Sequence, residues 1–409
     1  MGEVFRRYWL PALLSEQLAK PDCDPVRLEL LSEKMLAFRD SEGQLGLVDE
    51  FCAHRGVSLW FGRNEEGGIR CPYHGWKYDV NGQCIDVPSE RGSNFCNRIQ
   101  LKSYPMVERG GVVWVYMGTP ERQPPLPEYE FATVPTSQSY TSKRLQECNW
   151  LQALEGGIDS SHVSFLHSGS LDRDPLFKGA KGNQYNKSDL SPVFDVVEAD
   201  GGLLVGVRRN AEDEQYYWRV TPWLMPNFTM VPPRGDHPIH GHFWVPINDE
   251  NCWAWSFDYH PNRDLSTHER KAMEEGAGIH VKVDKDYKPL QRKENDYLID
   301  RDAQRKGIFF SGVEGIGMQD ASLQESMGAI QDRTRENLVG TDKGIIMTRR
   351  RLTEAANALQ ENPNLQLPGI APKHQKIRSA AVLLKRDLHF KDAAKDAFVA
   401  QPGKPHASV

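Results

Sequence analysis

The first 120 residues alternate short runs of β-forming residues with turns that contain glycine. The runs cover residues 26–31, 34–40, 44–50 and 112–118, and the breaks between runs carry Gly43, Gly67, Gly68, Gly82, Gly110 and Gly111. Short segments of this kind between turn signals indicate strands joined by tight connections. The pattern predicts a small antiparallel β domain with its functional groups at the loop tips.

A proline-rich segment, Thr119–Phe131, separates this part from the rest of the chain. Its prolines at positions 120, 124, 125 and 127 stiffen the backbone and cannot donate the hydrogen bonds of a central strand. We therefore predict an N-terminal domain over residues 1–120, a linker over residues 121–131 and a second domain over residues 132–409.

Beyond the linker the pattern mixes helical and strand periods. Residues 149–167 repeat apolar positions at about 3.6-residue spacing and predict a helix, whereas residues 193–260 predict six successive strands. Residues 261–305 are charged and favour helix, two more helices are expected near residues 320–338 and 343–360, and residues 402–409 suggest an unstructured tail. The predicted fold class is α+β, in which an all-β domain precedes an antiparallel sheet covered by helices.

Two cysteines and two histidines form the clearest chemical signal. Cys52 and His54 make a C-x-H pair, and Cys71 and His74 make a C-x-x-H pair within CPYHGW. A structural zinc finger usually joins its cysteines in one pair and its histidines in another, whereas each pair here mixes the two. The mixture suits a 2Fe–2S cluster in which one iron takes both thiolates and the other takes both imidazoles, as in Rieske centres. A mixed zinc site, or unrelated cysteines and histidines of the core, are the alternatives.

Charge and the remaining cysteines restrict the class of protein. The 409-residue chain has a formal net charge of −6 and no basic domain, which argues against nucleic acid as a partner. No run approaches 18 apolar residues and the N-terminus lacks the order of a signal peptide, so neither a membrane span nor secretion is expected. The other cysteines are scattered, which predicts free thiols in a reducing cytoplasm: Cys23, Cys84, Cys96, Cys148 and Cys252.

A second metal site is expected around His162 and His167. On a regular helix residues five apart diverge by about 140°, so these two imidazoles meet at one ion only if the helix loosens, which the nearby Gly156 and Gly157 favour. Two imidazoles and one carboxylate with open positions form the non-haem Fe(II) site of oxygenases. A structural histidine pair is the alternative interpretation.

The two motifs together resemble the large (alpha) subunit of Rieske non-haem iron ring-hydroxylating oxygenases. The run N-x2-Q-x2-E-x3-D-x2-H-x4-H from Asn149 to His167 carries the likeness, with RRYWLPALLS near the start and QDASLQESMGAIQDRTRENL toward the end. More narrowly the chain resembles the phthalate-dioxygenase-type branch, which includes phthalate, chlorobenzoate and phenoxybenzoate dioxygenases. The resemblance implies a Rieske domain, a helix-grip catalytic domain and a homo-oligomer, either a trimer or stacked trimers.

The resemblance also assigns residues. His162, His167 and Asp320 become the iron ligands, and an expected place at a helix start would favour the carboxylate of Asp320. From chemistry alone three other acids compete with Asp320, namely Glu314, Glu325 and Asp332. Asp159 matches a bridging aspartate that hydrogen-bonds His162 in its own chain and the cluster ligand His74 of a neighbouring subunit, which would orient both imidazoles.

The implied reaction is insertion of O2 into an aromatic carboxylate in catabolism. Each chain would hold one Rieske 2Fe–2S cluster and one mononuclear Fe(II), and would receive electrons from NADH through a reductase with flavin and a ferredoxin-type 2Fe–2S centre. The chain has no G-x-G-x-x-G fingerprint after a strand, so the reductase is expected to be a separate protein. Candidates for binding the carboxylate are Ser160, Ser161, Arg208, Arg209 and Arg219.

The abundant aromatic residues between Trp218 and Trp255 favour a two-ring substrate, so we expect dioxygenation of phenoxybenzoate. Dioxygenation of phthalate or chlorobenzoate, and monooxygenation or O-demethylation of an aryl carboxylate, are the nearest alternatives. A stand-alone Rieske electron carrier would lack the second iron, and a helix-grip binding module would not need His162, His167 and Asp320 together.

Overall fold

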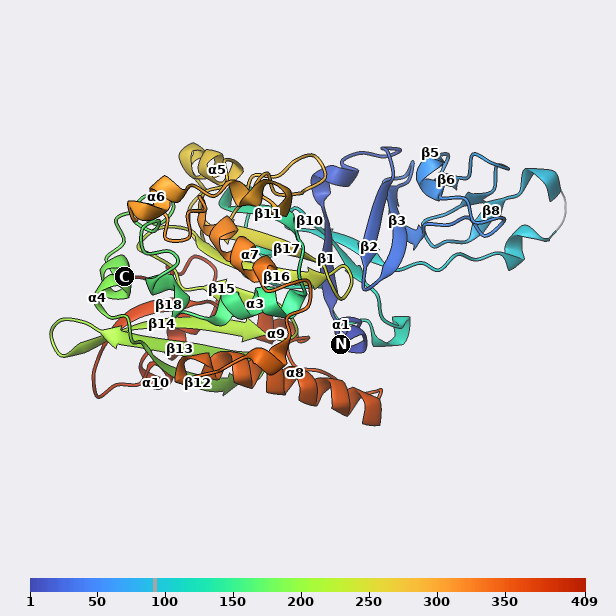
Figure 1. Ribbon diagram of the computed structural model, residues 1–409. Coiled ribbons are helices and arrows are strands. Elements are labelled where there is room, and N and C mark those ends of the chain that lie inside the picture. Colours follow the sequence, from blue (N-terminus) through green and yellow to red (C-terminus); the bar gives the residue numbers. More distant parts are fainter. Residues whose placement is uncertain (91–93) are drawn as a thin grey trace. The chain divides into compact units, whose positions relative to one another are not determined.

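The computed structural model describes residues 1–90 and 94–409, and the chain divides into two compact units (Figure 1). One unit comprises Val4–Pro124 with Gly2, and the other comprises Pro125–Val409 with Met1 and Glu3. The division falls between two prolines of the proline-rich segment.

Three small antiparallel sheets build the first unit. The first sheet has the order β1 (Trp9–Leu14), β10 (Val112–Tyr116), β9 (Met106–Arg109). The second has the order β2 (Val26–Leu30), β3 (Glu33–Arg39), β4 (Leu45–Asp49). The third has the order β5 (Arg63–Glu65), β6 (Gly68–Arg70), β7 (Lys77–Tyr78), β8 (Cys84–Asp86). The prediction of a small all-β domain is confirmed.

One apolar cluster of the first unit, with members from Leu36 to Leu101, includes Cys52 and Cys71. Gly82 lies at a tight turn that only glycine can make here. Its φ is +78°, and a Cβ at this position would lie 2.5 Å from the carbonyl oxygen of Leu101. The turn positions β7 and β8 next to each other, just after the second Cys–His pair.

One antiparallel sheet of eight strands forms the centre of the second unit. Its path runs β11 (Ser139–Gln146), β17 (Cys252–Tyr259), β16 (Ile239–Pro246), β15 (Phe228–Val231), β14 (Gln215–Leu224), β13 (Gly202–Asn210), β12 (Val193–Ala199). β18 (Ala380–Lys385) pairs with β14 outside this path. The six strands expected over residues 193–260 are all present.

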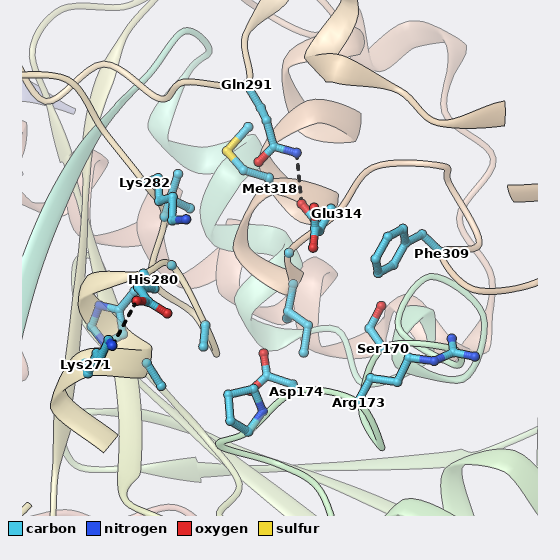
Figure 2. Close-up of a pocket in the computed structure, with 18 of the residues that line it drawn as sticks. Ser170, Arg173, Asp174, Lys271, His280, Lys282, Gln291, Phe309, Glu314 and Met318 are labelled. Carbon is cyan, nitrogen blue, oxygen red and sulfur yellow. Dashed lines mark hydrogen bonds and ion pairs between the residues drawn. The ribbon is translucent and has the colours of Figure 1, made fainter. Parts of the chain in front are cut away.

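Helices cover this sheet. α3 (Trp150–Ile158) contacts β14, β15 and β16, α8 (Lys343–Glu361) contacts β12 and β13, and α7 (Ile316–Ser326) lies beside α3. The remaining helices are short: α1 (Gly2–Phe5), α2 (Glu130–Thr133), α4 (Gly182–Ser188), α5 (Thr267–Glu274), α6 (Arg301–Arg305), α9 (Pro372–Gln375) and α10 (Phe390–Ala393). α5 and the residues before α7 border an open cavity (Figure 2). No helix within residues 1–90 and 94–409 combines the length and apolarity needed to cross a membrane.

Three helical predictions were wrong in extent. The helix expected over residues 149–167 ends at Ile158, because the Asp159 carboxylate accepts the N–H of Ser161 at 2.6 Å and forms a local turn instead. The helix expected near residues 320–338 is α7, which ends at Ser326. Asp320 is therefore the fifth residue of its helix, and the expected stabilisation at a helix start does not apply. Most of residues 261–305 are irregular.

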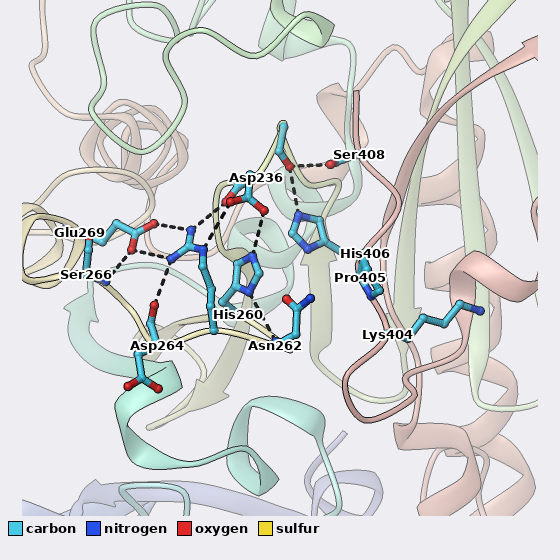
Figure 3. A network of polar contacts seen from close by, with 12 residues as sticks. Asp236, His260, Asn262, Asp264, Ser266, Glu269, Lys404, Pro405, His406 and Ser408 are labelled. Atoms are coloured by element: carbon cyan, nitrogen blue, oxygen red, sulfur yellow. Dashed lines mark hydrogen bonds and ion pairs between the residues drawn. The ribbon is translucent and has the colours of Figure 1, made fainter.

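The last residues have no regular secondary structure but are not a free tail. His406 donates its Nε2–H to the carbonyl oxygen of Gly235 at 3.1 Å, and Ser408 donates to the same oxygen (Figure 3). The buried Arg378 binds the carbonyl oxygen of Lys404. Backbone carbonyl groups that lack a strand partner are satisfied in this way by side chains.

A cluster of ionic contacts holds α3 against α8. The Arg349 guanidinium binds the carboxylates of Glu155 on α3 and Glu336, with the closest atoms 2.5–2.9 Å apart. Arg333 also contacts both carboxylates at 3.1 Å. Glu155 is almost fully buried, so its charge depends on these partners.

We predict that Arg349→Met destabilises the protein by about 2 kcal/mol, because it leaves the buried Glu155 carboxylate with one cation fewer. The measurement is the apparent unfolding temperature. Arg350→Met is the matched control, because Arg350 is the next residue on α8 and pairs with Glu198 in an exposed contact. Equal losses in the two variants would contradict the prediction.

Candidate functional site

His162, His167 and Asp320 come together in the second unit. The two Nε2 atoms lie 3.2 Å apart, and the Asp320 Oδ1 atom lies 3.4 Å from His162 Nε2 and 3.3 Å from His167 Nε2. Within the part of the chain that the structure describes, this is the one group of three or more possible ligands within 4.8 Å of one another. α3 ends four residues before His162, and the following turn lets the two histidines face each other.

The three atoms fit a metal ion. A point just off the plane of the triangle that they form lies about 2 Å from each of them, the usual length of a bond from a metal to nitrogen or oxygen. Each histidine has a partner for its other ring nitrogen: His162 Nδ1 lies 3.2 Å from Asp159 Oδ2, and His167 Nδ1 lies 2.8 Å from Gln319 Oε1. Nδ1–H donates in both cases, so both Nε2 lone pairs face Asp320, and three acceptors in contact need a cation between them.

The competing acids lie elsewhere. Glu325 accepts the backbone N–H of Glu147 and the hydroxyl of Tyr297, and Asp332 accepts the N–H and the hydroxyl of Thr334. Glu314 borders the open cavity. None of the three belongs to the histidine group, which leaves Asp320 as the carboxylate in place.

Charges within the group shift the pKa values of Asp320 and His162 in opposite directions. Burial alone would raise the pKa of Asp320, but the facing His167 and His162 lower it to about 2, so the group is a carboxylate at neutral pH. Burial opposes protonation of His162, yet Asp159 and Asp320 together raise its pKa. Asp159 thus makes the contact that was expected within its own chain. The expected contact with a neighbouring subunit stays a prediction.

Gly156 and Gly157 serve a different purpose from the one expected. Both lie inside the regular part of α3, so they do not loosen the helix. A Cβ at Gly156 would lie 2.2 Å from Gln324 Nε2, and a Cβ at Gly157 would lie 2.3 Å from Trp244 Cη2. The two glycines allow α3 to approach α7 and β16 closely, which sets the position of the residues that follow.

Three buried arginines surround the histidine–aspartate group in one pocket, namely Arg144, Arg219 and Arg234. Arg234 donates to Asn183 at 2.6 Å. Neither Nε nor Nη1 of Arg219 has a hydrogen-bond partner, and Nε of Arg144 has none. Burial, reinforced by the nearby Arg219 charge, lowers the pKa of Arg234 to about 9. The pocket therefore holds guanidinium N–H groups that have no hydrogen-bond partner among the described residues.

Sequence reasoning found only part of this pocket. Arg219 was among the candidates, whereas Arg144 and Arg234 were missed, although each is a cation within or beside a run of strand-forming residues. Arg209 is buried outside the pocket lining and binds Ser160 O at 2.7 Å and Ser164 Oγ at 3.1 Å. Arg208 packs over the ring of Tyr216, 4.4 Å from its centre. The pocket also contains His240 and His242, and burial lowers their pKa values to about 4 and about 3, so both are neutral.

The second candidate site lies at two loops of the first unit. Cys52 and Cys71 are buried, whereas His54 and His74 are exposed, and the two imidazole rings lie 4.4 Å apart. The Trp76 ring stacks on the His54 ring, and the two ring centres lie 4.6 Å apart. Two inner thiols and two outer imidazoles suit a cluster with one buried iron and one at the surface, through which electrons can pass.

Tyr78 contacts this site from β7. Its hydroxyl oxygen lies 3.2 Å from Cys52 Sγ, and the hydroxyl is also bonded by the N–H of Ala53. When the sulfur is a metal-bound thiolate, the hydroxyl donates to it. Such hydrogen bonds stabilise the reduced, more negative cluster and raise its potential.

We predict that Tyr78→Phe lowers the reduction potential by about 40 mV, the one-electron equivalent of a lost hydrogen bond of about 1 kcal/mol. The measurement is a redox titration followed by the visible spectrum. Tyr104→Phe is the control, because Tyr104 binds Glu33 in the same unit and does not contact a cysteine. A potential that is the same in all three proteins would rule out a contribution from this hydroxyl.

Comparisons with known proteins support the same interpretation. Residues 8–105 match the family model of the Rieske [2Fe-2S] domain, and residues 115–395 match the model described as LigXa C-terminal domain like. The chain is 38% identical to the 3-chlorobenzoate-3,4-dioxygenase oxygenase subunit of Comamonas testosteroni, over 96% of this chain and 94% of that protein.

Two further relatives are similar over most of their length. The chain is 34% identical to the phthalate 4,5-dioxygenase oxygenase subunit of Pseudomonas putida, over 96% of this chain and 90% of the relative. It is 30% identical to the phenoxybenzoate dioxygenase subunit alpha of Ectopseudomonas oleovorans, over 88% and 82% of the two chains. The crystal structure of dicamba monooxygenase bound to dicamba has the same fold, with a TM-score of 0.62 and 17% identity over 88% of this chain and 99% of that one.

Fold, site and relatives define the class of protein: a Rieske-type oxygenase subunit of the aromatic ring-hydroxylating enzymes, in which a Rieske domain precedes a catalytic domain. The matched Rieske domain supports a 2Fe–2S cluster as a cofactor. Within this class, the chain belongs to the phthalate-dioxygenase-type branch of the large (alpha) subunits.

Proposed function

We propose that this protein is the terminal oxygenase of a multicomponent system that oxidises an aryl carboxylate with O2. Electrons would come from NADH through a separate reductase with flavin and a ferredoxin-type 2Fe–2S centre. The observation that carries the substrate class is the buried Arg219, whose Nε and Nη1 atoms lack partners in the pocket of His162, His167 and Asp320.

An unpaired guanidinium is costly inside a protein. Arg219 is 2% exposed, so water does not replace the missing hydrogen bonds, and a buried charge without a partner costs several kcal/mol. A carboxylate can accept two parallel hydrogen bonds from one guanidinium. The three guanidinium groups and a ferrous ion would outweigh the carboxylates of Asp159 and Asp320, so the pocket favours an anionic ligand.

The proposed iron ligands are His162, His167 and Asp320, and the proposed cluster ligands are Cys52, His54, Cys71 and His74. The mononuclear iron, when bound, supplies the open coordination positions at which O2 is reduced. Asp159 and Gln319 hold the two imidazoles in the tautomer that exposes Nε2. Apolar side chains exclude water from the pocket, among them Val163, Leu171, Phe177 and Ile279.

The proposed substrates are chlorobenzoate, phthalate and phenoxybenzoate. Relatives named for these acids are 38%, 34% and 30% identical to this chain. The order of these sequence identities favours a one-ring acid as the first compound to test, although phenoxybenzoate was expected from the aromatic content of the sequence. The single anion that all three acids share is the carboxylate that Arg219 would bind.

The test is turnover of these three acids with ¹⁸O2, NADH and a compatible reductase. We expect NADH oxidation to be coupled to product formation for one acid, with two labelled atoms in the product. One labelled atom would favour the monooxygenase alternative. No labelled product from any acid, in protein with a full iron content, would contradict the proposal.

We also propose that the chain forms a trimer or stacked trimers in which Asp159 reaches His74 of the next subunit. The Asp159 side chain retains 23% exposure next to His162, so a partner can contact it. Mass measurement in solution tests the assembly. A monomer that is active at its assay concentration would contradict it.

A further inference from the structure

Figure 2 shows an open cavity of the second unit. Its volume is about 680 Å³, and it shares a lining residue with the pocket of the proposed iron site. It is bordered by residues 170–175, which follow His167, by α5, and by the residues that lead into α7. The iron pocket itself has about 70 Å³ of free space. A ring-sized molecule therefore finds room in the outer cavity first.

One side chain borders both spaces. Ile316 lines the iron pocket and the outer cavity, and its neighbours alternate, with Gly315 on the cavity side and Gly317 on the iron side. Ile316 precedes Asp320 by four residues in α7, which places the two side chains on the same face of the helix, one turn apart. The outer cavity thus comes within about one helical turn of the proposed iron ligand.

The wall around Ile316 is closely packed. A Cβ at Gly317 would lie 2.8 Å from the carbonyl oxygen of Ile279, so α7 crosses the segment 279–280 in direct contact. Ile279 faces the iron pocket and His280 faces the outer cavity. Since the backbones already touch at this crossing, the Ile316 side chain is the part of the wall that can move by a change of rotamer.

A second contact connects the cavity to the iron site. The hydroxyl of Ser170 lines the cavity and accepts a hydrogen bond from Gln319 Nε2 at 2.8 Å. The Oε1 atom of the same amide lies 2.8 Å from His167 Nδ1. Gln319 therefore links a side chain of the cavity lining to a proposed iron ligand.

The lining suits an aryl carboxylate. Arg173 and Lys282 are cations at the cavity, and Arg173 binds the backbone oxygens of Gly169 and Ile308 at 2.9 Å. Three carboxylates, Asp174, Glu275 and Glu314, also line the cavity, but among the described residues none of them forms an ion pair with Arg173 or Lys282. Phe309 and Ile316 supply the apolar surface that a ring requires.

We propose that this cavity is the vestibule through which the aryl carboxylate reaches the iron, and that Ile316 is the gate that limits its size. The inference rests on the proposed function. Opening then requires Ile316 to turn away from the crossing of α7 and segment 279–280. The gate would select by ring bulk, whereas Arg219 would select by charge.

The test is stopped-flow binding of 3-chlorobenzoate to the anaerobic holoenzyme without reductant, so that no turnover occurs. Tryptophan fluorescence reports binding, because Trp244 lines the iron pocket. We expect Ile316→Trp to slow both association and dissociation at least tenfold and to leave Kd within about threefold. Ile316→Ala should accelerate both rates and admit phenoxybenzoate more rapidly than the wild type does.

The control is Leu323→Ala, because Leu323 is an exposed apolar residue of the same helix outside both spaces. Iron content and the cluster spectrum show whether each variant is folded and loaded. Unchanged association and dissociation rates in both Ile316 variants would overturn the gate proposal and leave the proposed function standing. A change in Kd with an unchanged association rate would make Ile316 a contact residue and also overturn it. If the wild type binds none of the three acids, the proposed function fails and the gate fails with it.

A separate observation concerns two cysteines of the first unit. Cys84 Sγ on β8 lies 3.0 Å from Cys96 Sγ, closer than two sulfur atoms that merely pack. Cys84 is buried in the apolar cluster of Cys52 and Cys71, whereas Cys96 is half-buried. The neighbour of Cys96, Phe95, contacts Trp76, which stacks on His54.

We infer that Cys84 and Cys96 are a site of reversible oxidation by hydrogen peroxide. The more accessible Cys96 thiolate attacks the peroxide and becomes a sulfenic acid, with release of one water. The Cys84 sulfur then displaces the second water and forms the disulfide, so two thiols lose two electrons and two protons to one peroxide.

The test is peptide mapping by mass spectrometry of the holoenzyme before and after addition of hydrogen peroxide. We expect a cross-linked pair of peptides, two hydrogen masses lighter, that dithiothreitol separates again. In Cys84→Ser the same treatment should stop at the sulfenic or sulfinic acid of Cys96. Recovery of Cys84 as a free thiol in protein whose Cys96 is oxidised would overturn the inference.

Discussion

Replacing Asp320 with alanine is expected to remove the mononuclear iron and to abolish oxygenation, while the cluster still accepts electrons. Asp320 supplies the only carboxylate of the three-atom group, within 3.3–3.4 Å of both Nε2 atoms among the described residues. Two imidazoles alone hold a divalent ion weakly. The iron content should fall from about three to about two per chain, with the visible spectrum of the cluster unchanged.

Asp332→Ala is the matched control for this prediction. Asp332 was a competitor for the third ligand position and instead begins a short helical turn by binding Thr334. Its replacement should leave the iron content at about three per chain. A full iron content in Asp320→Ala would show that the ion has another carboxylate ligand, and equal loss in both variants would point to general damage.

Replacing Arg219 with methionine is expected to lower kcat/KM for an aryl carboxylate by about 10²–10³, because two charge-assisted hydrogen bonds are worth about 3–4 kcal/mol together. The same change should have little effect on the corresponding neutral amide. The measurement is the ratio of the two kcat/KM values in each protein. The wild type should prefer the acid, and the variant should lose that preference.

The unfolding temperature of the Arg219→Met variant distinguishes a binding role for Arg219 from a structural role. The Nε and Nη1 atoms of this guanidinium have no partner, so methionine removes an uncompensated buried charge and should not lower the unfolding temperature without substrate. Arg208→Met is the control for activity, because Arg208 packs on Tyr216 outside the pocket. A clear loss of stability in Arg219→Met would contradict the binding role.

The Rieske domain could be predicted because the chemistry of its proposed cluster ligands is local in sequence. Cys52, His54, Cys71 and His74 lie within 23 residues, and the order of residue types already separates a mixed 2Fe–2S site from a zinc finger. The strands also followed from alternation and turn signals. The exposure of the two histidines did not follow, because it depends on how the loops fold against Trp76.

The proposed iron site shows where local reasoning ends. His162 and His167 were found by spacing, but the helix that was expected to carry both ends at Ile158. Asp320 lies about 150 residues further along, and only its motif pointed to it, whereas its position within α7 removed the electrostatic reason given for it. Four carboxylates were candidates for the third ligand position. Tertiary packing brings only Asp320 to the two histidines, and the spacing of residues along the chain does not reveal this.

The buried arginines illustrate the same limit. Arg144, Arg219 and Arg234 come from different strands or loops, so the charge that they bring together is a property of the sheet and not of any segment. From the sequence alone, each of these arginines would be expected at the surface. A polar residue within a strand that is otherwise apolar is the signal that would have found them, as in the run around Arg219.

The two glycines of α3 limit how this enzyme can be evolved toward new substrates. Gln324 and Trp244 already occupy the space in which any other residue would place its side chain at positions 156 and 157. Mutant libraries that randomise these codons would consist mainly of misfolded clones. Val163, Thr221 and Val231 are better positions to randomise, because they line the pocket and already carry side chains.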